Sequence, residues 1–170
     1  MSYDLAQVNI ARLADDLDSP GLADFVTALD PVNAAADIAP GFVWRLQTED
    51  GNATSVAGFA ADQGAGVRVI TNMSTWRDVD SLAAFVYGPM HAAIMRRRRE
   101  WFLPIQEAYL ACWWVRAGHR PTVAEAEYRV ALLRQHGPTP ASFTLRRHFP
   151  APGLAGSSRA IERDAWPCGV

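Results

Sequence analysis

The stretch Met73–Phe102, MSTWRDVDSLAAFVYGPMHAAIMRRRREWF, reads as the end of a strand, then a turn, then a long helix. Asp78 or Asp80 can cap this helix, because a short acidic side chain accepts hydrogen bonds from the first free backbone N–H groups. The dipeptide Gly88-Pro89 predicts a break or bend, and Pro104 ends the helix. We therefore expect two helical segments joined by a corner.

The second helical segment carries two polar groups on an apolar stripe. His91, Met95, Arg98 and Phe102 follow the spacing i, i+4, i+7 and i+11, which places them along one side of a helix. A guanidinium there needs an acceptor, which is a structural carboxylate or carbonyl in one case and a ligand anion in the other. An imidazole there can accept a proton, donate to a ligand or fill a polar niche. His91 and Arg98 are accordingly the candidate catalytic residues.

The rest of the chain predicts an α+β fold. The expected order is a strand at 4–12, a helix at 22–37, strands at 42–47 and 67–74, the bent helix, a strand at 107–115, and a helix at 122–135. This βαββαβ order with an extra C-terminal helix is the ferredoxin-like arrangement. Pro31 is expected to kink or divide the first helix, and residues 142–147 to form a short further strand. We expect one domain at 1–150 and a flexible tail at 151–170.

The first strand assigns two faces to the sheet. Ala6, Val8 and Ile10 alternate with Gln7 and Asn9, so the apolar set is expected to face the helices. The two amides are then expected to face a second sheet, since large apolar groups on that side need a cover. A second subunit is the simplest cover, and two sheets facing each other would make a dimeric α+β barrel.

An aromatic-lined cavity is the predicted binding site. Planar aromatic groups with a few amides, an imidazole and a guanidinium suit a flat, partly anionic organic ligand. Of Trp113 and its neighbour Trp114, only one can point to the cavity side of a strand. The predicted substrate-binding residues are Gln7, Asn9, Trp44, Trp76, Phe85, Met95, Trp101, Phe102 and Trp113.

Composition excludes several chemistries. All 16 basic residues are arginine, so a Schiff-base lysine and a P-loop lysine are impossible. No GxGxxG, GxSxG, CxxC or HExxH motif occurs, so the sequence predicts no nucleotide cofactor, no hydrolase serine and no metal site. Cys112 lies in an apolar strand and is expected to be buried and inert. We expect no bound cofactor.

Charge and hydropathy bear on partners and location. A net charge of -2 gives no general attraction to nucleic acid or to an anionic membrane. No apolar run reaches membrane-spanning length, and the segment MSYDLAQVN lacks the features of a signal peptide. The expectation is a cytoplasmic protein with a small-molecule substrate.

Several segments together resemble a known family. DLAQVNIARL, PGFVWRL, MSTWRDVDSLAAFVY, HAAIMRRRREWF and AYLACWWVRAGHRPT are similar to an uncharacterised domain-of-unknown-function family over roughly residues 4–149. That family belongs to the dimeric α+β barrel superfamily, which also holds antibiotic-biosynthesis and heme-degrading monooxygenases. The resemblance implies a homodimer and cofactor-independent oxygenation. Asn9 matches an Asn of the heme-degrading branch, but Phe85 and Met95 stand where that branch has Trp and His.

The leading hypothesis is a cofactor-independent monooxygenase-like enzyme acting on an aromatic or polyketide-like secondary metabolite. An isomerase or cyclase on a similar substrate needs the same anion and differs only in how that anion then reacts. A non-catalytic ligand-binding dimer and a heme-binding protein with His91 as axial ligand are the remaining alternatives.

Overall fold

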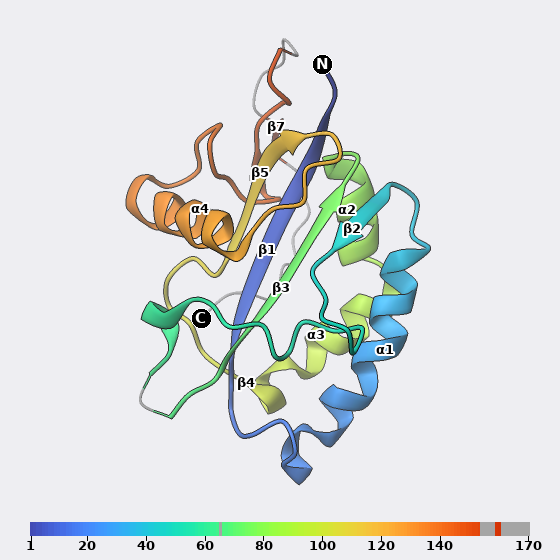
Figure 1. Cartoon of the computed structure of the whole chain (residues 1–170), viewed down its shortest axis with the longest axis vertical. Coiled ribbons are helices and arrows are strands. Elements are labelled where there is room, and N and C mark those ends of the chain that lie inside the picture. The colour runs from blue at the N-terminus through green and yellow to red at the C-terminus, as the bar shows by residue number, and fades with distance from the viewer. Residues whose placement is uncertain (65, 154–158, 161–170) are drawn as a thin grey trace.

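The computed structural model describes residues 1–64, 66–153 and 159–160 (Figure 1). In chain order it contains β1 (Tyr3–Leu13), the 3₁₀ turn η1 (Pro20–Leu22), α1 (Ala23–Asp37), β2 (Phe42–Arg45), the 3₁₀ turn η2 (Ala60–Asp62), β3 (Val69–Trp76), α2 (Val79–Val86), α3 (Pro89–Trp101), β4 (Phe102–Leu103), β5 (Leu110–Arg116), α4 (Val123–His136), β6 (Arg147–His148) and β7 (Arg159–Ala160). Most of the predicted tail at 151–170 lies outside the described residues.

The main sheet is antiparallel with β1 at its centre. Its strands run in the order β2-β3-β1-β5, and the short β4 pairs with the end of β1. Leu5 lies opposite Trp76 on one side and opposite Trp114 on the other. This order confirms the predicted α+β, ferredoxin-like fold with an extra C-terminal helix.

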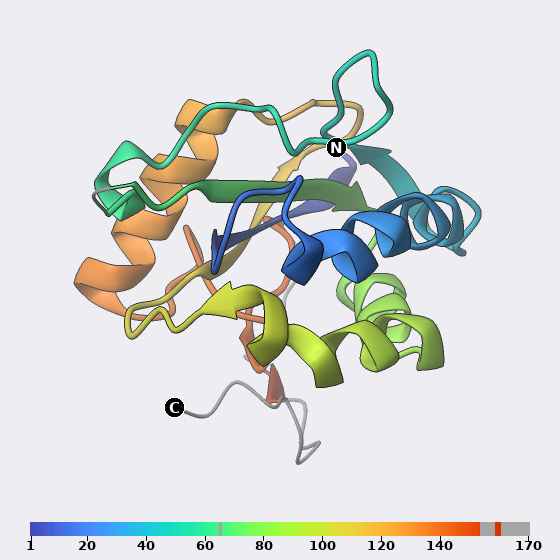
Figure 2. The same ribbon diagram turned by 90° about the horizontal axis from the view of Figure 1, so that it is seen from below.

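The helices cover both faces of the sheet, which corrects one expectation. Ala6, Val8 and Ile10 do pack on a helix, but that helix is α4, through Ala126 and Val130. The amide-bearing face of β1 is the one that α1, α2 and α3 cover, as Figure 2 shows. The expectation that Gln7 and Asn9 would face a second subunit's sheet is therefore wrong for this chain. The extra helix takes the apolar face, and the polar face is left to the helices between the strands.

The α2–α3 corner forms where the sequence predicts it. The Asp78 carboxylate accepts a hydrogen bond from the Ser81 N–H at 2.7 Å and caps α2. The helix ends at Val86, and α3 begins at Pro89. A Cβ added at Gly88 would lie 3.0 Å from the carbonyl oxygen of Phe85, so glycine permits this close approach.

Two local predictions need correction. Pro31 does not divide α1, because Phe25 and Ala36 on either side of it are both buried, and tertiary packing outweighs one lost backbone hydrogen bond. The other half of that expectation, a kink at Pro31, stays a prediction. Residues 142–147 do not form a strand of the sheet. Phe143 makes an isolated bridge to Cys112, with backbone N···O distances of 2.7 and 2.9 Å, and the chain then turns away.

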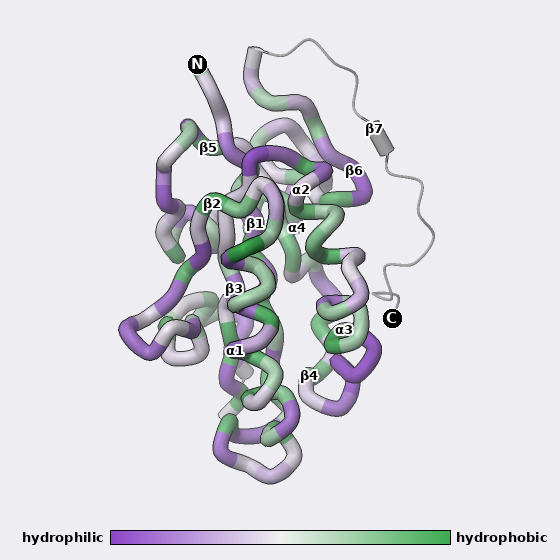
Figure 3. The backbone as a smooth tube through the Cα atoms, turned by 90° about the vertical axis from the view of Figure 1, so that its right-hand side faces the viewer, coloured by the Kyte–Doolittle hydropathy of each residue, from purple (hydrophilic) through white to green (hydrophobic). Residues whose placement is uncertain are grey.

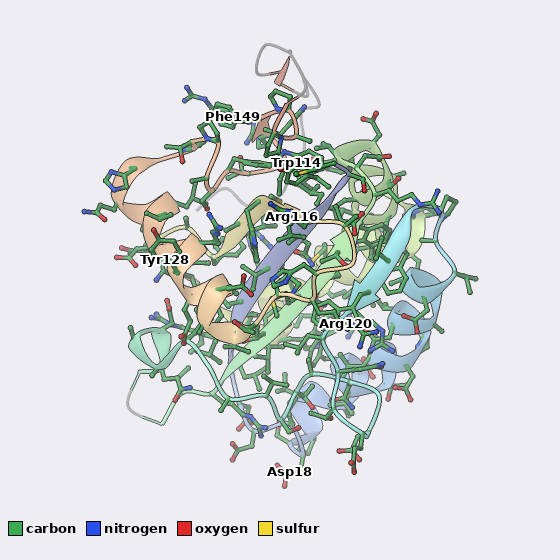
Figure 4. All side chains as sticks on the ribbon, turned by 45° about the horizontal axis from the view of Figure 1, so that its top comes forward. Asp18, Trp114, Arg116, Arg120, Tyr128 and Phe149 are labelled. Atoms are coloured by element: carbon green, nitrogen blue, oxygen red, sulfur yellow. The ribbon has the colours of Figure 1, made fainter. Side chains whose placement is uncertain are left out.

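Side chains and a glycine cap both ends of α4, and the segment after it packs on the end of the sheet. Thr122 and Glu125 form the predicted capping box, and Gly137 ends the helix with a φ of 68°. The Trp114 indole N–H donates to the Phe149 carbonyl oxygen at 2.8 Å, and Figure 4 shows both residues at the same end of the molecule. The segment after α4 thus covers the end of the sheet face that α2 leaves open.

Candidate functional site

A cavity of about 320 Å³ lies between the amide-bearing face of the sheet and the helices α1, α2 and α3. We call it the sheet–helix cavity. Its floor comes from β1 and β3, and its walls come from the three helices and from residues 52–54 of the β2–β3 connection. The volume is within the range of small-molecule sites. All of its lining residues come from one chain.

The structure brings most of the predicted site residues together around this cavity. One set comes from the sheet and α2, and the other comes from the stripe of α3 that the sequence indicates. The lining residues among the predicted ones are Gln7, Asn9, Trp76, Phe85, His91, Met95, Arg98 and Phe102.

Three predicted tryptophans lie elsewhere. Trp113 packs on the α4 side of the sheet, and Trp44 packs against the same cluster. A register shift between Phe42 and Trp44 breaks the alternation of β2, and Phe42 and Arg45 line the cavity while Trp44 does not. Trp101 is buried with the cluster of Leu13 at the end of β1. Neither Trp113 nor Trp114 lines the cavity.

His91 has a defined hydrogen bond. It sits in the first turn of α3, and its Nδ1 lies 3.0 Å from the carbonyl oxygen of Val86. A carbonyl oxygen only accepts, so Nδ1 carries the proton and donates. Burial lowers the pKa of His91 below 6.5 and outweighs the hydrogen bond to Val86, which raises it. The imidazole is therefore neutral at pH 7, with the lone pair on Nε2.

An aromatic wall stands beside His91. Trp76 and Phe85 stack with ring centroids 5.2 Å apart and an interplanar angle of 30°. Phe42 meets Trp76 edge-on at 5.4 Å, and Phe85 lies 5.5 Å from the imidazole ring. The three aromatic rings thus form an apolar cluster next to a nitrogen base, which suits a planar ligand.

A polar strip crosses the floor of the cavity. The Gln7 side-chain amide donates to the Ser74 hydroxyl at 2.9 Å and to the Asn72 side-chain oxygen at 3.2 Å. The Trp76 indole N–H donates to the same Ser74 oxygen at 2.9 Å. Neither Ser74 nor Asn72 was among the predicted site residues. Their positions two residues apart in β3, directly opposite the two amides of β1, are the signal that identifies them.

The α3 stripe changes character along its length. Figure 3 shows the apolar start of α3 giving way to a hydrophilic last part. Met95 and Arg98 line the cavity and are partly buried. Arg97 points away from it and binds the exposed carboxylates of Asp24 and Glu100, with N···O distances of 2.7 and 2.8 Å. Arg98 and Arg99 thus both line the cavity, while Arg97 forms ion pairs at the surface.

Helix α1 supplies a wall that sequence reasoning missed. Leu29, Val32 and Asn33 line the cavity from α1, which packs beside α3. Their spacing fits the helix period, but an apolar stripe of this kind equally fits plain core packing. Only the position of α1 over the polar strip distinguishes a cavity wall from plain core packing.

The described residues contain neither a metal-binding cluster nor a membrane-spanning helix. Across 1–64, 66–153 and 159–160, no group of three or more His, Cys, Asp or Glu side chains is placed to hold a metal ion. Within the same residues, every helix is too short or too polar to cross a membrane.

Together these features define an α+β protein of ferredoxin-like topology with a cavity of small-molecule size inside one chain. Residues 4–159 match the family described as Domain of unknown function (DUF3291), and the chain belongs to that family.

Three solved structures are similar at low identity. PA3566 from Pseudomonas aeruginosa has 13% identity and a TM-score of 0.42, covering 72% of this chain and 98% of its own. NE2512 from Nitrosomonas europaea, a protein of unknown function, has 15% identity and a TM-score of 0.43, with coverages of 71% and 96%. A candidate antibiotic biosynthesis monooxygenase from Chloroflexus aurantiacus J-10-fl has 15% identity and a TM-score of 0.40, with coverages of 71% and 98%. No curated protein matches the chain. These likenesses are too distant to assign a role to any residue.

Proposed function

We propose that this protein is a cofactor-independent enzyme that removes a proton from a planar, electron-rich aromatic or polyketide-like metabolite, with His91 as the base. The observation that carries the proposal is the state of His91. Its Nδ1–H is anchored on the Val86 carbonyl oxygen, and burial keeps the ring neutral. Its Nε2 is therefore the nitrogen that can accept a proton from a ligand.

The other lining residues fit an anionic intermediate. Phe85, which stacks on the buried Trp76, lines the cavity with a flat ring against which a conjugated ring system can lie. Arg98 lines the same cavity and supplies positive charge near the ligand. An enolate or phenolate formed by loss of the proton would thus be held between aromatic surface and a cation.

Oxygenation is the proposed fate of this anion, in keeping with the resemblance to monooxygenases. For an anthrone, His91 takes one proton from the ring CH₂, and the carbanion transfers its electrons to O₂ to form a peroxide. Loss of water then breaks the O–O bond and leaves a carbonyl. The net change is CH₂ plus O₂ to C=O plus H₂O, with no external reductant. Isomerisation or cyclisation would use the same anion without O₂.

We also propose that the enzyme works as a cytoplasmic homodimer in secondary metabolism. β2 is an edge strand of the sheet, and Val43 and the nearby Ile38 are 40% and 85% exposed. Exposed apolar groups beside an open strand edge favour association. Light scattering on a sizing column tests the dimer directly, and a monomer at micromolar concentration would contradict it.

The test of the enzyme is oxygen uptake with an anthrone or an electron-rich phenol. His91→Ala is expected to lower turnover by about a hundredfold or more, which is typical for loss of a general base. Arg98→Ala is expected to lower it too, while fold and oligomeric state stay unchanged. His136→Ala is the matched control, because His136 is exposed at the end of α4.

Two results would overturn the proposal. Full activity in both His91→Ala and Arg98→Ala would show that the cavity residues take no part in the chemistry. A Soret band on addition of hemin, lost in His91→Ala, would instead identify a heme protein.

A further inference from the structure

Ser74 occupies an unusual position in the floor of the sheet–helix cavity. It lies on β3 opposite Gln7, is 6% exposed and lines the cavity. Its oxygen accepts two hydrogen bonds, from the Gln7 side-chain amide and from the Trp76 indole, both at 2.9 Å. A hydroxyl oxygen has two lone pairs, so its capacity to accept is filled.

The hydrogen bond from Trp76 fixes the Ser74 oxygen as the acceptor. An indole N–H can only donate, and Trp76 is 1% exposed, so its N–H has no access to bulk water. Both hydrogens of the Gln7 amide nitrogen are used, one on Ser74 and one on Asn72. The Ser74 O–H hydrogen therefore remains as a donor, held in a buried position at the cavity floor.

We propose that the Ser74 hydroxyl is the donor that binds and stabilises the anionic oxygen of the ligand. The ligand class is then a compound with a phenol or an enolisable carbonyl, whose oxygen becomes negative when the proton leaves. This inference rests on the proposed function and adds a specificity-determining residue to it. A buried, preorganised donor interacts more strongly with a developing charge than a solvated one does.

The experiment measures ionisation of a bound probe without turnover. 4-Nitrophenol and alizarin are the probes, because their phenol and phenolate forms absorb differently. Each is titrated with pH in the presence of saturating full-length protein. The wild-type protein is expected to lower the apparent pKa of the bound probe relative to the free probe.

Ser74→Ala removes the donor and is expected to raise the apparent pKa of the bound probe by about one unit relative to wild type, since a hydrogen bond to a charged group is involved. Ser74→Cys keeps a side chain of similar size with a weaker donor and is expected to act in the same direction. If Ser74→Ala fails to fold, the pKa of the probe bound to Ser74→Cys tests the inference instead. Thr75→Val is the matched control, because Thr75 is the next residue on β3, its side chain is buried, and it faces the α4 side.

The outcomes separate this inference from the proposed function. An unchanged probe pKa in folded Ser74→Ala and Ser74→Cys overturns the inference, and so does failure of both probes to bind. Oxygen uptake that depends on His91 but not on Ser74 rejects the inference alone. A Ser74-dependent pKa shift without oxygen uptake rejects the oxygenation and keeps the binding role.

Discussion

Replacing Arg134 with alanine should destabilise the fold strongly, because it leaves a buried carboxylate without its partner. Arg134 donates to both carboxylate oxygens of Asp62, at 2.7 and 3.1 Å, and to the Ala108 carbonyl oxygen at 2.8 Å. The Asp62 side chain is 6% exposed and that of Arg134 is 21% exposed. The pair thus ties the β2–β3 connection to α4 and to the chain before β5.

The magnitude is set by this burial. Breaking a buried ion pair by removing one partner typically costs about 3–5 kcal/mol. Since Arg134 keeps some solvent contact, we expect the lower end, about 3 kcal/mol off the free energy of unfolding. Glu107→Gln is the control, because Glu107 contacts the same guanidinium at 3.3 Å but is 70% exposed. Its expected cost is about 0.5 kcal/mol or less.

The assay is urea unfolding monitored by far-ultraviolet circular dichroism at pH 7. In the Arg134→Ala background, Asp62→Asn should recover part of the loss, because it removes the stranded charge. A loss below about 1 kcal/mol in Arg134→Ala, or an equal loss in Glu107→Gln, would refute the electrostatic reasoning.

Three further predictions concern buried groups. Thr75→Val should raise the free energy of unfolding by about 1 kcal/mol, because the buried Thr75 hydroxyl has no hydrogen-bond partner among the described residues; an unchanged urea midpoint would contradict this. The pKa of His91 in the folded protein lies below 6.5, so the unfolded chain binds more protons at acid pH. The contribution of His91 to the free energy of unfolding is therefore complete above pH 6.5 and is lost as the pH falls below it. Thermal unfolding of His91→Gln should therefore show a weaker loss of stability between pH 7 and acid than wild type, and identical profiles would reject the assignment. Burial raises the pKa of Cys112 to about 12, so in a Cys168→Ser background a thiol reagent at pH 8 should label the protein only when urea is added.

Local patterns predicted much of the fold. Strand alternation placed the amides and the apolar residues of β1 on opposite faces, and Gly88-Pro89 predicted the corner that puts His91 at the start of α3. These features depend on a few neighbouring residues and on backbone sterics. The helical stripe of His91, Met95 and Arg98 reached a common cavity for the same reason.

The features that sequence reasoning missed depend on distant contacts. Which face of the sheet the helices cover was set by the return of α4, which no local pattern encodes. Trp44 lies outside the cavity because of a register shift in β2, and Trp101 packs in the cluster around Leu13. Ser74 accepts hydrogen bonds from two donors, one of them on another strand. The dimer, the domain boundary at residue 150 and the catalytic roles remain predictions.

The state of the His91 ring is the most direct test of the account. A long-range proton–nitrogen correlation spectrum, with the His91 signal assigned by its loss in His91→Gln, reports the tautomer and the pKa together. The account predicts a proton on Nδ1, a pKa below 6.5, and a shift of the Nε2 signal when alizarin is added. A proton on Nε2, or a pKa above 6.5 with no response to alizarin, would contradict it.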